Sequence, residues 1–204
     1  MDRSVYDTNE QGERIESKIV VALERISEAF RVLLWNESKD LGLSPIQIQI
    51  LIFIRMHPTS LCKISYLAEE FKLTKPTISD AVKSLEQKML VLKYVEPHDS
   101  RSYTLHLTEA GIQLAERLSS FSNVIKRPVE AMSSVQKTQL WFSLLTIINS
   151  LRDAGIISVQ RNCQSCYKYE NKGGVHYCHL MQKTMLNEDL KLDCPDHAPA
   201  VDVD

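Results

Sequence analysis

The stretch from Ser60 to Gly111 restricts the possible fold more than any other part of the chain. Within it, apolar residues recur at helical spacing in two consecutive segments, which a short turn at Lys72-Leu73 separates. The apolar positions are Ile64, Leu67, Ala68 and Phe71 in the first segment and Ile78, Ala81, Val82 and Leu85 in the second. This spacing predicts two amphipathic helices joined by a tight turn.

Two short runs of alternating residues follow, Val91–Glu96 and Tyr103–Leu107, and residues 97–101 separate them as a turn would. Helix, turn, helix and a two-stranded ribbon form the layout of a winged helix-turn-helix. That motif places its second helix in the major groove of DNA. The sequence therefore predicts double-stranded DNA as a partner.

The start of the second helix carries residue types that suit DNA recognition. Short hydroxyl side chains can approach base edges, while lysines reach phosphates. Pro76 is tolerated because the first turn of a helix has no use for the missing N–H. The candidate DNA-binding residues are Thr74, Lys75, Pro76, Thr77, Ser79 and Lys83. The alternative is an ordinary solvated helix face.

At the tip of the ribbon, Asp99 and Arg101 are further DNA-binding candidates. An arginine there can enter the minor groove, where negative potential is concentrated. Alternatively, Arg101 only pairs with Asp99 and shapes the turn, and both roles are compatible.

Four other segments have helical spacing and complete the expected fold class, which is mainly α with a small β wing (α+β). They are residues 13–35, residues 46–57 after Ser44-Pro45, a helix from Thr108-Glu109 onwards, and residues 133–153. The first and last carry more apolar surface than one small domain can cover, so we expect them to be long dimerisation helices of a homodimer. A homodimer suits a palindromic operator. The alternative is that these helices fold back on their own domain.

The net charge of −2 argues mildly against a nucleic-acid ligand, because DNA affinity comes largely from neutralised phosphates. Only the docking face must be basic, however. No apolar run is long enough to span a bilayer, and the polar N-terminus is unlike a secretory signal, so a cytoplasmic protein is expected. No phosphate-binding glycine loop or catalytic triad order is present, which argues against an enzyme.

Four cysteines crowd into the last quarter of the chain: Cys163, Cys166, Cys178 and Cys194. Four thiolates can hold a structural zinc ion or an iron–sulfur cluster, and free or disulfide-switching thiols are the third possibility. Imidazole also binds zinc, so His176, His179 and His197 are nearby substitute ligands. Because four cysteines already fill a tetrahedral site, His176 and His179 are expected to be bystanders. The tail has few apolar residues, and we expect it to unfold locally when metal is lost.

These patterns predict a flexible N-terminus over residues 1–12, a DNA-binding and dimerisation domain over 13–158, a four-cysteine metal-binding module over 159–197 and a flexible tail over 198–204. The boundary falls near Val159, where the composition becomes polar and rich in Cys and Lys. Cys62 stands apart from the tail. It is expected to be either a reactive thiol at a helix start or a small semi-buried side chain with no special role.

The string Asp99-Ser100-Arg101-Ser102 followed by residues 105–111 (Leu-His-Leu-Thr-Glu-Ala-Gly) resembles the MarR family of bacterial transcription regulators. The resemblance covers about Glu13 to Asp153. It implies a homodimeric repressor or activator whose affinity for DNA is altered by a small-molecule effector or by oxidation.

The chain departs from the family pattern at two positions. Ser100 stands where the family usually has a second arginine, which removes one phosphate-seeking cation from the wing. Met89 stands where the family favours glycine after the reading helix. A left-handed methionine costs about 1 kcal/mol, so the helix is expected to end differently here.

Together these features predict a sequence-specific DNA-binding transcriptional regulator with a metal site that stabilises the protein or senses metal or redox state. The alternative function is a protein-interaction module that uses a winged helix and a zinc knuckle for docking. The low net charge supports that alternative.

Overall fold

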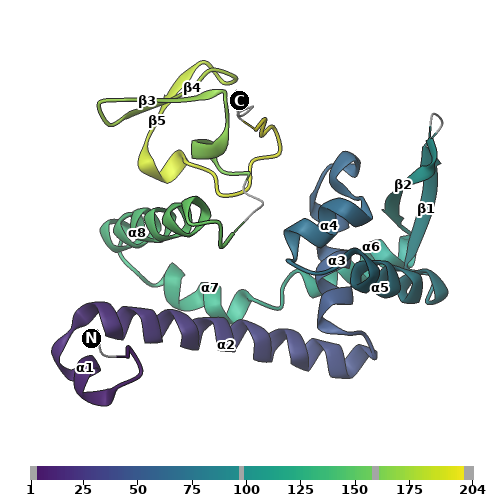
Figure 1. The fold of residues 1–204 in the computed structure, drawn as a ribbon, viewed down its shortest axis with the longest axis horizontal. Coiled ribbons are helices and arrows are strands. Elements are labelled where there is room, and N and C mark those ends of the chain that lie inside the picture. The colour runs from purple at the N-terminus through teal and green to yellow at the C-terminus, as the bar shows by residue number, and fades with distance from the viewer. Residues whose placement is uncertain (1–3, 97–98, 158–160, 200–204) are drawn as a thin grey trace. The chain divides into compact units, whose positions relative to one another are not determined.

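A computed structural model describes residues 4–96, 99–157 and 161–199. The chain divides into two compact units. The first comprises Met1–Arg55, Ala81–Leu92 and Leu107–Val124, and the second comprises Met56–Asp80, Lys93–His106 and Ile125–Asp204. The described part is mainly helical with two small sheets, which agrees with the predicted class (Figure 1). None of the described helices is long and apolar enough to cross a membrane.

The first unit begins with three helices, α1 (Thr8–Glu13), α2 (Ile15–Leu41) and α3 (Pro45–Met56). Helix α1 overlaps residues 8–12 of the segment that was expected to be flexible. Helix α2 extends beyond the predicted end and stops at Gly42, which has a φ of 58°. The predicted start of α3 is confirmed, because the helix begins at Pro45 and the side chain of Ser44 accepts a hydrogen bond from the amide of Gln47 at 3.4 Å. The apolar residues Ile48, Ile50, Leu51, Phe53 and Ile54 of α3 are buried.

A short 3-10 turn η1 (Thr59–Leu61) leads into the helix-turn-helix, α4 (Ile64–Glu70) and α5 (Lys75–Gln87). Lys72 ends α4 with a φ of 53°. The amide of Leu73 donates to the carbonyl of Ala68 at 3.0 Å, and that of Lys72 to Glu69 at 3.3 Å. These bonds form a Schellman turn, which satisfies the last carbonyls of α4 and redirects the chain sharply. The predicted tight turn is confirmed.

Helix α5 ends with the same kind of turn, centred on Met89. The φ of Met89 is 57°, and the amide of Leu90 donates to the carbonyl of Leu85 at 3.0 Å. The sequence predicted that the helix would end differently because a left-handed methionine is strained, and that prediction was wrong. Met89 is 76% exposed, so the strain of its positive φ is confined to the backbone of this residue.

The wing consists of β1 (Val91–Glu96) and β2 (Asp99–Leu107), which pair in a two-stranded sheet, and α6 (Glu109–Leu118) follows. Thr108 caps α6 by accepting a hydrogen bond from the amide of Gly111. The amide of Thr108 also donates to the carbonyl of Leu90 at 3.1 Å. A Cβ on Gly111 would lie 2.1 Å from that carbonyl oxygen, so only glycine fits there.

The rest of the second unit contains most of α7 (Asn123–Glu130), α8 (Ser134–Asp153) and the cysteine-rich tail. The tail forms η2 (Cys163–Ser165), an antiparallel sheet and η3 (Asn187–Asp189), and the sheet strands are β3 (Tyr169–Lys172), β4 (Val175–Cys178) and β5 (Lys183–Met185). Gly173 and Gly174 turn β3 back into β4. The tail lies against α8, where Leu145, Met185 and Leu190 are buried together (Figure 1). The predicted boundary near Val159 lies outside the described residues.

Candidate nucleic-acid interface and cysteine site

Helix α5 has one apolar and one polar face, as the spacing of its residues predicted. Its buried residues are Ile78, Ala81, Val82 and Leu85. Of the candidate contact residues, Ser79 is half-buried and the exposed ones are Thr74, Lys75, Pro76, Thr77 and Lys83. The structure therefore leaves the polar side chains of this face available to a ligand.

The first turn of α5 is fixed by its own hydroxyl groups. The amide of Thr77 donates to Oγ1 of Thr74 at 3.3 Å, and the two Oγ1 atoms lie 2.8 Å apart. This cap holds two hydroxyl groups at the start of the helix, where a reading helix contacts base edges.

The wing is stabilised by ring contacts between its strands. The ammonium group of Lys93 lies 5.0 Å from the ring centroid of Tyr103, and the rings of Tyr94 and His106 meet edge to face at 4.6 Å. Asp99 and Arg101 both lie in β2, but their side chains fall outside the described part of the structure.

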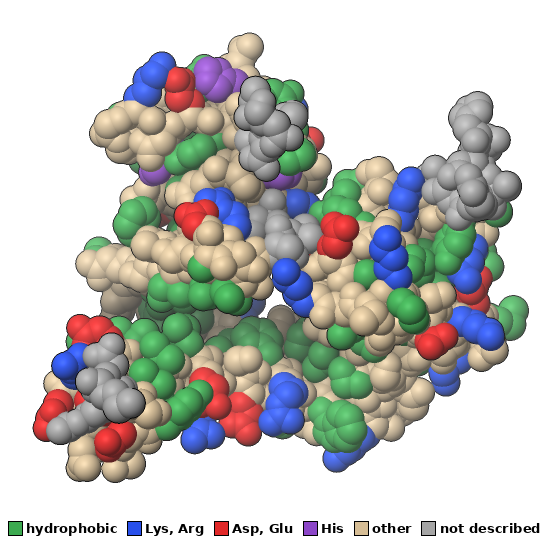
Figure 2. All heavy atoms as spheres, in the orientation of Figure 1, with side chains coloured by type: hydrophobic (Ala, Val, Ile, Leu, Met, Phe, Trp, Pro, Cys, Tyr) green, Lys and Arg blue, Asp and Glu red, His purple; other side chains and the backbone are tan. Residues whose placement is uncertain are grey.

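Exposed apolar side chains mark the two helices that were expected to dimerise (Figure 2). They include Ile15, Ile19, Val20, Ile26, Phe30, Val32 and Trp35 on α2 and Val135, Leu140, Phe142 and Leu151 on α8. A soluble monomer rarely exposes large contiguous apolar patches, so these helices suit an interface.

The four tail cysteines, Cys163, Cys166, Cys178 and Cys194, line one small cavity of about 30 Å³. All four are free thiols. Burial raises the pKa of Cys163 above its ordinary value, and the other three cysteines raise it further, against a hydrogen bond from the Lys191 amide. Within the described ranges, no three Cys, His, Asp or Glu side chains are arranged closely enough to hold a metal ion.

The three tail histidines have other partners. His176 is buried between the hydroxyl of Tyr169 and the amide oxygen of Asn187, each at 2.7 Å. His179 lies 3.3 Å from Glu170, and Nε2 of His197 lies 3.0 Å from the hydroxyl of Ser165. The expectation that His176 and His179 are bystanders stays a prediction.

Sequence reasoning missed Arg161, whose side chain is only 11% exposed. It donates to the hydroxyl of Tyr66 at 2.6 Å and to the carboxylate of Glu70 at 2.7 and 3.3 Å. It also pairs with Asp193, which lies 2.7 Å from His57. We call Arg161, Tyr66, Glu70, Asp193 and His57 the Arg161 cluster. No local pattern could reveal it, because Arg161 and Glu70 are 91 residues apart.

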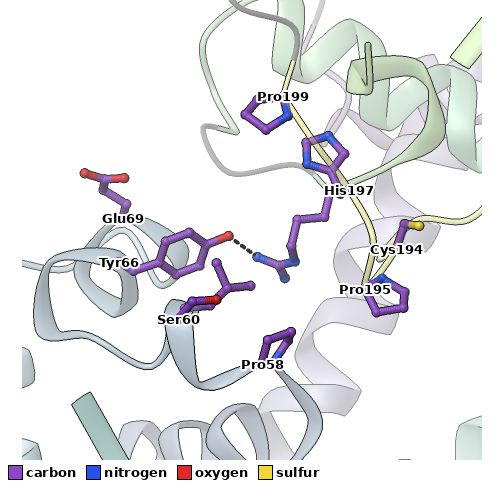
Figure 3. Close-up of a pocket in the computed structure, with 10 residues that line it drawn as sticks. Pro58, Ser60, Tyr66, Glu69, Cys194, Pro195, His197 and Pro199 are labelled. Carbon is purple, nitrogen blue, oxygen red and sulfur yellow. Dashed lines mark hydrogen bonds between the residues drawn. The ribbon is translucent and has the colours of Figure 1, made fainter. Parts of the chain in front are cut away.

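Two residues of the Arg161 cluster, Arg161 and Tyr66, line a cavity of about 410 Å³ (Figure 3). The walls come from α4, from the turn before it and from the end of the tail, with Tyr66, Pro58 and Pro195 among the lining residues. Burial alone would lower the pKa of Arg161, but hydrogen bonds to Asp193, Glu70 and Tyr66 outweigh burial and raise it. The guanidinium is therefore a fixed positive charge.

Cys62 does not have the environment of a reactive thiol. It is 1% exposed, and its Sγ donates to the carbonyl of Pro58 at 3.5 Å. Burial raises its pKa to about 11. The structure therefore favours the second of the two expectations for this residue.

The arrangement described for residues 56–118 is that of a winged helix. Residues 41–102 match the sequence model of the MarR family. Among solved structures, the chain is similar to MepR of S. aureus in a DNA complex, with 24% identity, a TM-score of 0.56, and coverage of 65% of this chain and 97% of MepR. MepR in a DNA-binding conformation gives 23% identity, a TM-score of 0.57, and coverage of 65% and 98%. No match was found among curated proteins.

Proposed function

We propose that this protein is a sequence-specific DNA-binding transcriptional regulator that acts as a homodimer. The observation that carries the proposal is the face of α5. Its hydroxyl and lysine side chains are exposed at the start of the helix, opposite a fully buried apolar face. The match of residues 41–102 to the MarR family and the likeness of the fold to MepR in complex with DNA support the same function.

In this proposal Thr74 and Thr77 approach base edges, and Lys75 and Lys83 neutralise phosphates. Arg101 contributes from the wing. The apolar surfaces of α2 and α8 join two copies, so that two reading helices meet a palindromic operator.

The proposal is tested by selecting binding sites from random duplexes and measuring affinity by fluorescence anisotropy at physiological salt. We expect one enriched, palindromic sequence. Lys75→Ala and Arg101→Ala should weaken binding and reduce its salt dependence, because each removes a cation. Lys172→Ala, which changes an exposed cation of the tail, is the control. If no duplex is preferred over bulk DNA, the DNA-binding proposal fails and the protein-docking alternative gains.

We further propose that the four tail cysteines hold a metal, zinc first and an iron–sulfur cluster second. Support comes from their gathering at one cavity and from the small apolar core of the tail. Four thiolates at about 2.3 Å from a zinc ion would form a closed structural site. All four cysteines line the same cavity, so the change needed to reach that geometry would be confined to the residues around it.

Metal and acid-labile sulfide analysis of protein purified without oxygen decides between the two. About one zinc per chain with no visible colour indicates a structural zinc site. Iron with sulfide and a brown colour indicates a cluster. Protein that contains neither leaves redox chemistry of the thiols as the remaining interpretation. A small-molecule effector stays a prediction from the resemblance.

A further inference from the structure

The Arg161 cluster joins two segments that are far apart in the sequence. On one side, Arg161 bonds to Tyr66 and Glu70 of α4. On the other, it pairs with Asp193 of the tail. Because Arg161 and Glu70 are both largely buried, at 11% and 21% side-chain exposure, this interaction is screened little by solvent.

The tail side of the cluster is built into the cysteine site. Arg161 stands two residues before Cys163, and Asp193 immediately precedes Cys194. The amide of Cys194 donates to the carbonyl of Arg161 at 2.9 Å, and residues 161 and 193 form a parallel β-bridge. The two cysteines and the two charged residues therefore share one pair of backbone segments, so a change in the separation of the sulfur atoms is passed to the ion pair.

The other side of the cluster lies next to the reading helix. Glu70 is the last residue of α4, and Lys75 begins α5 after the left-handed turn at Lys72. Residues 56–80, which include α4, this turn and the first residues of α5, belong to the same compact unit as the tail. A restraint on Tyr66 and Glu70 therefore acts one short turn away from Thr74 and Lys75.

We propose that Arg161 is a clamp that couples metal occupancy of the cysteine site to the position of α4, and through it to the reading helix. The proposal rests on the proposed metal site and on the proposed DNA binding. With metal bound, Cys163 and Cys194 are held together, Asp193 orients Arg161, and the guanidinium holds Glu70 and Tyr66. Without metal, the two backbone segments separate and the restraint on α4 is lost.

In this proposal the metal binds the clamped arrangement more tightly than the open one, which is the thermodynamic condition for allosteric coupling. Coupling is reciprocal, so a DNA duplex that prefers the clamped state must raise the affinity for zinc by the same factor. Typical couplings change affinity by about 5- to 150-fold.

Hydrogen exchange of the full-length reduced protein tests the clamp without any need for DNA. The probe is zinc(II), which is added as the free ion or removed with a chelator. The readout is the hydrogen-exchange rate of the amides of Leu67–Leu73. Removal of zinc should speed this exchange by about tenfold, because the restraint on α4 is lost. In Arg161→Gln the exchange should already be fast with zinc bound, and chelation should change it little.

Tyr66→Phe removes one acceptor and keeps the fold, so it should give an intermediate result if Arg161→Gln proves unstable. Lys172→Gln is the matched control, because it removes an exposed tail cation that pairs only locally with Glu170. The clamp is overturned if zinc changes the exchange of Arg161→Gln as much as it changes that of the unchanged protein. It is also overturned if zinc does not change the exchange of the unchanged protein.

The same proteins, titrated with the selected duplex, connect the clamp to DNA. The affinity of the unchanged protein should differ about tenfold between its zinc-loaded and zinc-free forms, and Arg161→Gln should lose that difference. A zinc-dependent exchange without any preferred duplex would show that DNA binding has failed while the clamp holds. If the protein takes up no zinc and holds no iron–sulfur cluster, the coupling is overturned together with the metal site.

Discussion

The winged-helix segment and the cysteine-rich tail are stabilised in different ways. The largest fully buried apolar side chains among the described residues, which include Ile48, Leu51, Leu67, Ile78, Leu85, Leu105 and Leu118, all come from residues 48–118. In the tail, Met185 and Leu190 are the large buried apolar residues, and both pack with Leu145 of α8.

Polar contacts take the place of a core in the tail. The buried side chain of Asn162 bonds to Asn149, and the indole of Trp141 donates to the carbonyl of Asn187 at 3.1 Å. A segment of this size with so little apolar burial usually needs a disulfide or a metal. We therefore expect that apolar burial suffices for the winged helix, whereas the tail depends on its cysteines.

The largest expected effect is that of removing one cysteine ligand. Cys178→Ser should unfold the tail, because structural zinc supplies about 10–16 kcal/mol of folding free energy in small metal-dependent modules. Limited proteolysis should then cut within residues 161–199 and leave residues 45–118 intact. The control is Cys62→Ser, which should leave the tail protected. If the tail of Cys178→Ser stays protected from proteolysis, the metal is not its main source of stability.

Truncation of an apolar side chain sharpens the same comparison. Leu67→Ala should lower the free energy of unfolding by about 2–5 kcal/mol, because the side chain is 0% exposed and leaves a cavity. Leu190→Ala should cost less in the metal-loaded protein. Urea unfolding followed by circular dichroism measures both variants. An equal loss would show that the tail relies on apolar burial as much as the winged helix does.

The close approach of α6 to the end of α5 gives the next prediction. Gly111→Ala should destabilise the protein by about 1–3 kcal/mol, because the new Cβ would clash with the carbonyl of Leu90. Gly12→Ala is the matched control, since nothing lies within 4 Å of its Cβ position. Thermal unfolding compares the two. A melting temperature unchanged by Gly111→Ala would contradict the described packing.

Relief of strain at the end of α5 should have a smaller and opposite effect. Met89→Gly should stabilise the protein by up to about 1 kcal/mol, because glycine adopts a positive φ without penalty. Lys88→Gly, one residue earlier and still within the last turn, should destabilise instead. If urea unfolding shows that both variants lose stability equally, the left-handed conformation of Met89 is contradicted.

The smallest effect concerns Cys62, the cysteine of the winged-helix segment. Its pKa of about 11 means that the thiolate, which is the reactive form, is scarce at neutral pH. Alkylation of Cys62 by iodoacetamide, followed by mass spectrometry, should be slow and should still increase from pH 9 to pH 10. A thiol with an ordinary pKa would level off in that range. An alkylation rate that levels off between pH 9 and pH 10 would therefore contradict the buried environment of Cys62.

Much of the winged helix could be predicted because its signals are local. The spacing of Leu67 and Ile78 with their neighbours indicated two helices, and the alternation in residues 91–96 indicated a strand. The end of α5 was predicted wrongly because intrinsic strain at Met89 was weighed without the hydrogen bonds that the turn gains from Leu90.

The tail could be predicted only in part. The spacing of its cysteines suggested one site, and the structure places all four at one cavity, while metal binding stays a prediction. Strands β3, β4 and β5 have only three or four residues, too few for a clear alternation. The contact of Arg161 with Glu70 crosses 91 residues, and no spacing rule reaches that far.

The hydrogen bond from the Thr108 amide to the carbonyl of Leu90 closes the base of the wing. Residues 91–107 therefore form an insert whose two ends are fixed together, independently of what lies at the tip. Doubling the length of a flexible loop between two fixed ends costs only about 0.6 kcal/mol in chain entropy. The tip can thus be lengthened or exchanged to change its reach toward a ligand, while the length and the end point of the reading helix stay as they are.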